Sequence, residues 1–244
     1  MHLSTCTLAH RLTCGQLRNT GLLKAIMALS AQHLLRQDQS EVHKFASDQN
    51  LAIQYYYETL HYVQTALQYN SYAHSEELLA TTLIISTYEM LNESQLEWQR
   101  HLKGVFWIQR SQNVDGASGG IRQAVWWAWL RQDVWAAFRE KRKCFSFWKP
   151  TIDHVDLNPT ELIDRSVYLF SQAVNYCADI TDLSRPDSIR ERLETADVLL
   201  GKLDHWKSCL GEAAKSLPIS PSDTTFQRIW IHPPHLGSYA FDAS

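Results

Sequence analysis

The sequence predicts an all-α protein. Along most of the 244 residues, apolar side chains recur at intervals of three and four, which is the spacing of one face of a helix. Glycine (9) and proline (7) are scarce, so the chain lacks the turn formers of a sandwich of many short strands. No alternating stretch is long enough to build a sheet. We therefore expect a single multi-helix domain over residues 17–244, after a weakly structured segment, 1–16.

The expected helices follow one another along the chain, over 21–36, 45–67, 75–91, 94–108, 121–141, 162–181 and 189–217. The third has the clearest start, because Ser75 is a good N-cap and is followed by Glu76 and Glu77, whose charges favour the first turn of a helix. Residues 113–120 hold three glycines with Asn, Asp and Ser, which predicts a loop. Prolines bracket an irregular connection over 150–159.

Two of these helices, 75–91 and 121–141, are apolar on nearly every side, which indicates that they are central and fully buried. They nevertheless contain Glu89, Arg131 and Asp133. A buried charge is costly unless it is paired and hydrogen-bonded. We expect Glu89 to pair with Arg131, and Asp133 to bond to an indole N–H or a helix end. This candidate buried polar cluster is interpreted as fixing the core rather than contacting a ligand.

Tryptophan is abundant, with seven of nine residues between positions 98 and 148. The surplus favours an aromatic pocket wall for an apolar molecule, with the candidates Trp98, Trp107, Trp127 and Trp135. Plain core packing explains the same surplus at least equally well.

The motifs of enzymes and metal centres are missing. The chain has no Gly-x-Ser-x-Gly elbow and no phosphate-binding glycine loop, so no catalytic residue is predicted. Glu93, Glu97 and His101 are spaced like metal ligands along a helix, but a solvated helix face explains them better. His232 and His235 flank two prolines, which gives an extended segment rather than a zinc-binding helix. We expect no metal and no cofactor.

Charge and hydropathy restrict the partners. The chain has 23 basic and 26 acidic residues, a net charge of −3, and no basic face, which argues against direct nucleic-acid binding. No apolar run reaches the length of a membrane span, roughly 18 residues. The five cysteines are widely spaced, as in a soluble protein of a reducing, intracellular compartment.

Five segments together carry a resemblance to a known family. They are 21–34 (GLLKAIMALSAQHL), 55–60 (YYYETL), 78–91 (LLA to YEML), 98–104 (WQRHLKG) and 127–137 (WAWLRQDVWAA). A later segment, 229–235 (IWIHPPH), fits the same order. In this order they resemble the fungal-specific transcription factor domain, the regulatory region downstream of the zinc binuclear cluster in fungal transcription factors. The resemblance extends over residues 17–244.

The resemblance implies an all-helical domain that regulates transcription in the nucleus without catalysis. Its expected partners are a small apolar effector, transcriptional co-regulators, or a second copy in a homodimer. The family's zinc cluster needs six closely spaced cysteines, whereas Cys6 and Cys14 stand alone, so neither zinc nor DNA binding is implied. Because the family's domain continues beyond the His-Pro-Pro-His segment, a fragment, a C-terminally truncated gene product and a stand-alone form remain alternatives.

Two other functions remain open from the residues themselves. One is a helical enzyme or binding protein acting on an apolar small molecule, with Glu89 or Glu97 beside a histidine. The other is a scaffold for protein interaction. An enzyme should gather polar groups in a concave site, whereas a regulatory scaffold should bury its few charges in pairs.

Overall fold

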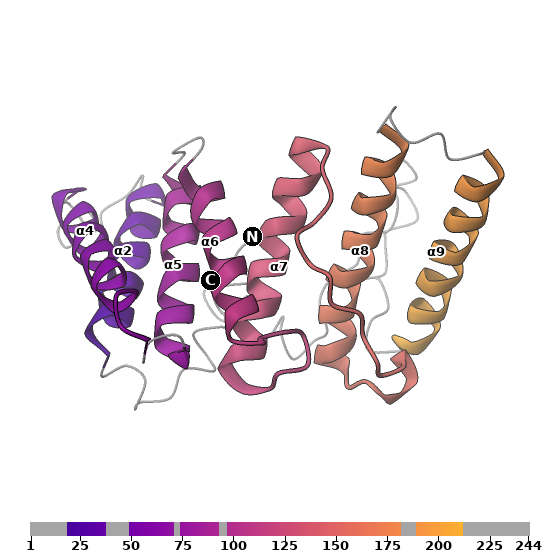
Figure 1. The fold of residues 1–244 in the computed structure, drawn as a ribbon, viewed down its shortest axis with the longest axis horizontal. Coiled ribbons are helices and arrows are strands. Elements are labelled where there is room, and N and C mark those ends of the chain that lie inside the picture. The colour runs from indigo at the N-terminus through magenta and orange to yellow at the C-terminus, as the bar shows by residue number, and fades with distance from the viewer. Residues whose placement is uncertain (1–18, 38–48, 71–73, 93–96, 182–188, 212–244) are drawn as a thin grey trace, which may run out of the picture. The chain divides into compact units, whose positions relative to one another are not determined.

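The structure is a computed structural model, and it describes residues 19–37, 49–70, 74–92, 97–181 and 189–211. Within these ranges it contains helices and no strand, which confirms the all-α class (Figure 1). The helices are α2 (Thr20–Gln37), α4 (Gln49–Ala66), α5 (Glu76–Leu91), α6 (Glu97–Ser111), α7 (Gly120–Glu140), the 3-10 turn η3 (His154–Asp156), α8 (Pro159–Thr181) and α9 (Ile189–Cys209). None of the helices in the described ranges is long and apolar enough to cross a membrane.

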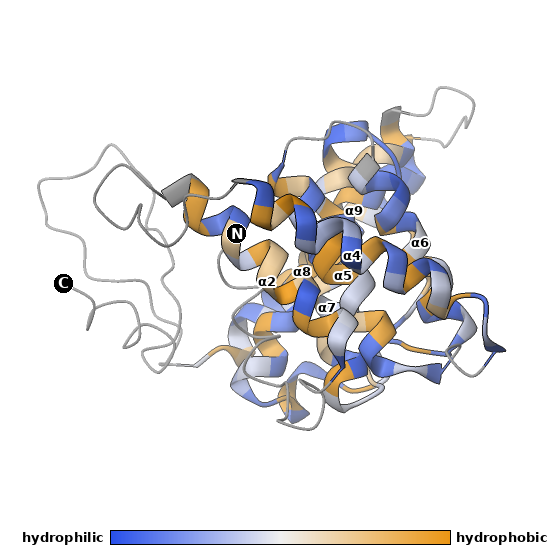
Figure 2. Ribbon diagram, turned by 90° about the vertical axis from the view of Figure 1, so that its left-hand side faces the viewer, coloured by the Kyte–Doolittle hydropathy of each residue, from blue (hydrophilic) through white to orange (hydrophobic). Residues whose placement is uncertain are grey.

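The chain divides into two compact units, Met1–Pro150 and Thr151–Ser244. The expected single domain over 17–244 stays a prediction. The mixture of polar and apolar residues along the helices in Figure 2 reflects the periodicity from which they were predicted.

Local signals set the helix ends. As predicted, Ser75 caps α5, because its hydroxyl accepts a hydrogen bond from the Leu78 N–H at 3.2 Å. The prediction for the last helix was too long: α9 ends at Cys209 rather than at 217. Gly211 has a φ of +62°, a left-handed conformation that glycine adopts readily just after a helix end. The connection over 150–159 contains η3, and Pro159 begins α8.

In the first unit, α5 is the central helix. It packs against α2, α4, α6 and α7, and no residue of α5 is classed as exposed. The prediction of a central helix over 75–91 is therefore confirmed, but its burial is not complete, since the side chain of Glu76 in the first turn is 38% exposed. On one side of it, Ala28 of α2 and Ala52 of α4 surround Tyr88, and the three side chains form a fully buried cluster. Small residues let these helices approach each other closely.

The second predicted central helix, α7, departs from the expectation at one face. It packs against α5 and α6, and twelve of its residues are buried. However, the side chains of Trp135 and Phe138 are 53% and 55% exposed. They lie three residues apart, on the same face of the helix, and their rings meet edge to face at 6.3 Å. An apolar composition on every side therefore did not require burial on every side.

In the second unit, α8 packs against α9, and η3 contacts α9. The indole N–H of Trp206 on α9 donates to the carbonyl of Leu162 on α8 at 2.8 Å. This bond joins residues 44 positions apart in the sequence and fixes the two helices of the unit relative to each other.

Candidate functional site

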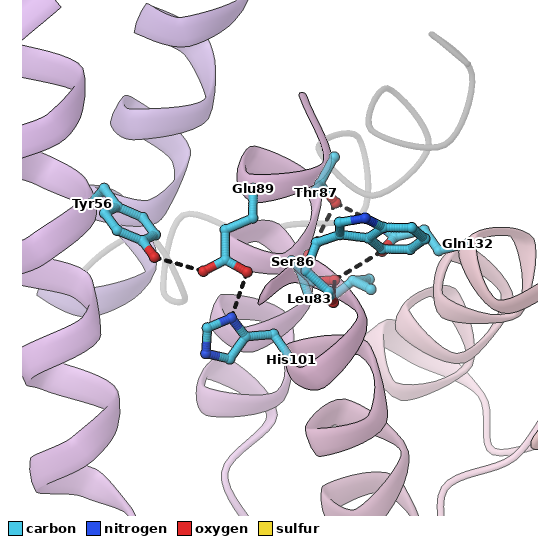
Figure 3. Close-up of polar contacts among 8 residues, drawn as sticks. Tyr56, Leu83, Ser86, Thr87, Glu89, His101 and Gln132 are labelled. Atoms are coloured by element: carbon cyan, nitrogen blue, oxygen red, sulfur yellow. Dashed lines mark hydrogen bonds and ion pairs between the residues drawn. The ribbon is translucent and has the colours of Figure 1, made fainter. Parts of the chain in front are cut away.

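Three helices of the first unit each bring one polar side chain to a common point. Tyr56 comes from α4, Glu89 from α5 and His101 from α6, and the carboxylate lies between the other two (Figure 3). The apolar residues that flank each of them place the helices side by side, so the polar groups meet inside the bundle. We call these three residues the Glu89 network.

Both oxygens of the Glu89 carboxylate have a partner. The hydroxyl of Tyr56 donates to Oε1 at 2.6 Å, and Nδ1 of His101 forms a short contact with Oε2. Glu89 is 2% exposed, whereas the side chain of His101 is 43% exposed. Solvent therefore reaches the network through the imidazole, and a protonated His101 makes the contact an ion pair. The buried charge is satisfied, as the physical argument from the sequence required.

Aromatic stacking holds Tyr56 in place. Its ring stacks on that of Tyr88 at a centroid distance of 4.8 Å and an interplanar angle of 19°. Burial raises the pKa of Tyr88, and the negative charge of Glu89 adds to this shift. Tyr88 therefore serves as a neutral, packed platform under the Tyr56 ring.

A second polar network lies between α5 and α7, on the other side of α5 in Figure 3. The amide of Gln132 accepts a hydrogen bond from the Ser86 hydroxyl at 3.2 Å and donates one to the Thr87 hydroxyl at 2.7 Å. Gln132 and Ser86 are both buried. The central helix is thus hydrogen-bonded to a neighbour on both sides.

Asp133 has its own partners at the end of α7. Its side chain is fully buried, Oδ1 lies 2.9 Å from Nη1 of Arg142, and Oδ2 accepts a hydrogen bond from the Phe145 N–H at 2.7 Å. Lys141 adopts the left-handed conformation that ends α7, and the chain turns there so that Arg142 and Phe145 lie beside Asp133. The expected partner was an indole N–H or a helix end, whereas the observed partners are a guanidinium and a backbone N–H that follow the end of α7. Burial raises the pKa of Asp133, and the charge of Arg142 opposes that shift.

The predicted buried cluster is therefore distributed over separate places. Glu89 and Asp133 are buried as expected and have different partners. Arg131 is only partly buried, unlike Glu89 and Asp133. The partners that the structure gives to Glu89 are Tyr56 and His101, and its pairing with Arg131 stays a prediction.

The four candidate pocket tryptophans lie in two kinds of environment. Trp98 and Trp127 are buried, with 6% and 5% exposure, whereas Trp107 and Trp135 are 57% and 53% exposed. The Trp127 N–H donates to the carbonyl of Gly116 at 3.3 Å, so this indole is satisfied within the core. These observations support core packing for the buried pair.

Several residues weighed from the sequence lie outside the described residues. They are Cys6, Cys14, Glu93, His232 and His235.

Sequence reasoning did not single out Tyr56 as a site residue. It interpreted His101 as part of a solvated helix face, although its enzyme alternative did place Glu89 or Glu97 beside a histidine. The spacing of His101 from acidic residues on its own helix drew attention to it, but its observed partner is on α5. The sequence does signal that Glu89, an acid in an otherwise apolar helix, needs a polar partner. It does not identify which residue that partner is.

Taken together, the fold and the site define an all-helical protein whose described buried carboxylates are engaged inside the bundle. Residues 10–113 match the family model described as the fungal specific transcription factor domain. The match confirms the resemblance over this segment, and it indicates a role in transcription regulation. The segment includes α2, α4, α5 and α6, and with them the Glu89 network. Neither a curated protein nor a solved structure matches the chain.

Proposed function

We propose that this chain regulates transcription in the nucleus by recognising a co-regulator protein, and that it neither contacts DNA nor catalyses a reaction. The observation that carries the proposal is the family match over residues 10–113, which includes four packed helices of the first unit. The net charge of −3 and the wide spacing of its five cysteines support a chain without a DNA-binding zinc cluster.

An exposed aromatic patch on the first unit supports a protein partner. Phe106 lies between Trp107 and Phe147, with centroid distances of 5.3 and 6.4 Å. Trp107 and Phe147 are 57% and 75% exposed, and the guanidinium of Arg110 lies 5.7 Å from the Phe147 ring centroid. Aromatic residues and arginine are enriched where proteins bind one another. The patch suits a co-regulator segment with apolar and acidic side chains.

The geometry of the Glu89 network supports a scaffold rather than an enzyme. Glu89 does lie beside a histidine, as the enzyme alternative required. However, its carboxylate is buried and engaged at both oxygens, which leaves it poorly placed to bind or deprotonate a substrate. A charge held in this way is what we expect of a regulatory scaffold.

A cleft in the second unit favours small-effector binding as a second candidate function. It lies between α8 and α9 and has a volume of about 360 Å³. Its lining includes Tyr176, Arg192, Val198 and Lys202, so polar and apolar groups are mixed. Such a lining fits a small molecule with polar as well as apolar groups, rather than a purely apolar one.

The test of the main proposal is a tethering experiment in a fungal host. The full chain is fused to an unrelated DNA-binding domain, and transcription of a reporter gene is measured. We expect the fusion to change transcription, and the double variant Trp107→Ala/Phe147→Ala to lose most of that change. Trp135→Ala is the matched control, because Trp135 has a similar exposure on a different helix.

Three results would contradict the proposal. They are a wild-type fusion without any effect on the reporter, an equal loss in the Trp135→Ala control, and a tagged full chain that stays out of the nucleus. Salt-dependent binding of the purified chain to DNA would contradict the part of the proposal that concerns DNA.

A further inference from the structure

Three side chains with metal-binding atoms converge in the second unit. Asp153 and His154 lie at the start of η3, and His205 lies on α9. One ligand atom from each of the three residues lies within 4.8 Å of the others. The second unit begins beyond residues 10–113, so this cluster is independent of the family match and of the proposed function.

Local bonds hold the carboxylate and the distal histidine together. Nε2 of His205 lies 2.8 Å from Oδ1 of Asp153, and the same oxygen accepts a hydrogen bond from the Val155 N–H at 3.2 Å. Asp153 thereby caps η3 and is fixed relative to the backbone. The ring centroids of His154 and His205 are 5.2 Å apart and the rings are tilted at 54°, so the two imidazoles are neighbours that do not stack flat.

We propose that Asp153, His154 and His205 bind one divalent cation of the zinc class. Two imidazole nitrogens and one carboxylate oxygen are a ligand set that zinc accepts, with a fourth position left for water or another ligand. In a tetrahedral site with metal–ligand bonds of about 2.0–2.1 Å, the ligand atoms lie roughly 3.3 Å apart. The observed spacings, from 2.8 Å to at most 4.8 Å, reach that value by small side-chain rotations.

The surrounding charges act on a bound cation in opposite directions. The positive charge of Arg165 acts on His154 and Asp153, and it opposes a bound cation. Glu161 lies close enough to Arg165 to offset part of that charge. His205 and Asp153 are exposed, so the ligands are accessible without unfolding of the unit. A bound ion would join η3 to α9, through ligands as far as 52 residues apart in the chain.

Titration of the full chain with Zn²⁺, followed by calorimetry, tests the proposal. His232 and His235 are replaced by alanine in every protein used, so that this histidine pair cannot account for binding. We expect one zinc ion per chain, and an affinity that falls by about 100-fold or more in His154→Ala and in His205→Ala, because each removes a direct ligand. His61→Ala is the matched control, since His61 is an exposed histidine on α4 and should leave the affinity unchanged.

A second measurement separates metal binding from misfolding. Circular dichroism should show the same helix content in all variants, and Co²⁺ should give the intense visible bands of a tetrahedral site in the parent but not in Asp153→Asn. Zinc should also raise the melting temperature of the parent more than that of the variants. Equal zinc affinity in the parent, His154→Ala and His205→Ala would overturn the proposal, as would a cobalt spectrum that Asp153→Asn leaves unchanged.

Discussion

The hydroxyl of Tyr56 donates a hydrogen bond of 2.6 Å to Glu89, across the contact between α4 and α5. His101 of α6 contacts the other oxygen of the same carboxylate. One buried acid thus connects three helices, all within the segment that matches the family model. The network explains why the central helix tolerates a charge near its C-terminal end: the carboxylate exchanges its water for two specific partners.

Removal of the Tyr56 hydroxyl tests this explanation. Tyr56→Phe keeps the ring that stacks on Tyr88 and deletes only the hydrogen bond to Glu89. We expect the free energy of unfolding to fall by about 1–2 kcal/mol, because a bond to a charged, buried acceptor is lost. Tyr57→Phe is the control: Tyr57 is the next residue and is 64% exposed, so its change should stay below about 0.5 kcal/mol. Equal losses of unfolding free energy in Tyr56→Phe and Tyr57→Phe would show that the hydrogen bond to Glu89 does not stabilise the fold.

Truncation of the acid itself should cost more. Glu89→Ala leaves the hydroxyl of Tyr56 and the ring nitrogen of His101 without their common acceptor, and it also opens a cavity beside α5. We expect a loss of about 3 kcal/mol, and a smaller loss for Glu89→Gln, whose amide oxygen still accepts one bond. Urea unfolding followed by tryptophan fluorescence measures both. A Glu89→Gln variant as unstable as Glu89→Ala would contradict this ranking.

The close approach of α2 to α4 gives a third prediction. A Cβ atom added at Gly21 would lie 2.1 Å from a ring carbon of Tyr62, whose hydroxyl accepts a hydrogen bond from Asn19 at 2.8 Å. Because the ring is held by that bond, Gly21→Ala should destabilise the first unit by roughly 2 kcal/mol. Gly104→Ala is the matched control, since nothing lies within 4 Å of its added Cβ and helix propensity predicts a gain of about 0.5–1 kcal/mol. Thermal unfolding should therefore shift in opposite directions for the two variants.

Local features of the fold could be predicted from the sequence because they depend on neighbouring residues. The cap at Ser75 and the start of α5 follow from contacts three residues apart. The end of α9 was placed too far along because the apolar pattern continues, although Gly211 offered a stop signal. Helix periodicity also suggested all-round burial of α7, yet it cannot show which face lacks a covering neighbour.

The candidate site could be predicted only in part, because its contacts are not local. Burial of Glu89 followed from its place in an apolar helix, and the need for partners followed from the cost of a buried charge. The partners themselves are 33 and 12 residues away, on helices whose packing determines which side chains meet. Likewise, Arg142 reaches Asp133 only because the chain reverses at Lys141. No spacing rule contains that information.

The buried ion pair at the end of α7 predicts a pH dependence. Burial raises the pKa of Asp133 above its ordinary value of 3.8, so the unfolded chain ionises this group first. The stability contributed by Asp133 is therefore present in full below pH 3.8 and declines as pH rises through the higher folded-state pKa. We expect the free energy of unfolding of the wild type, relative to that of Asp133→Asn, to fall between pH 3.8 and the folded-state pKa of Asp133. Above that pKa the difference should stay constant.

Arg142→Gln provides the test of the cause. Since the charge of Arg142 opposes the shift, its removal should raise the pKa of Asp133 further and extend the decline to higher pH. Urea unfolding at a series of pH values measures the difference between each variant and the wild type. If the stability of the wild type relative to Asp133→Asn rose with pH, the attraction of Arg142 would outweigh the effect of burial on Asp133, contrary to the prediction.

Beside this ion pair, Cys144 should be an unreactive thiol. It is 7% exposed, and burial, with a further contribution from Asp133, raises its pKa to about 12. At pH 8 the thiolate fraction is then about a thousandfold lower than that of a thiol with the ordinary pKa of 9.0. Cys177 is exposed and serves as the internal reference. With iodoacetamide and peptide mapping by mass spectrometry, we expect Cys177 to be alkylated while Cys144 stays unmodified until urea unfolds the chain. Equal labelling of both in the folded protein would show that the end of α7 opens readily to solvent.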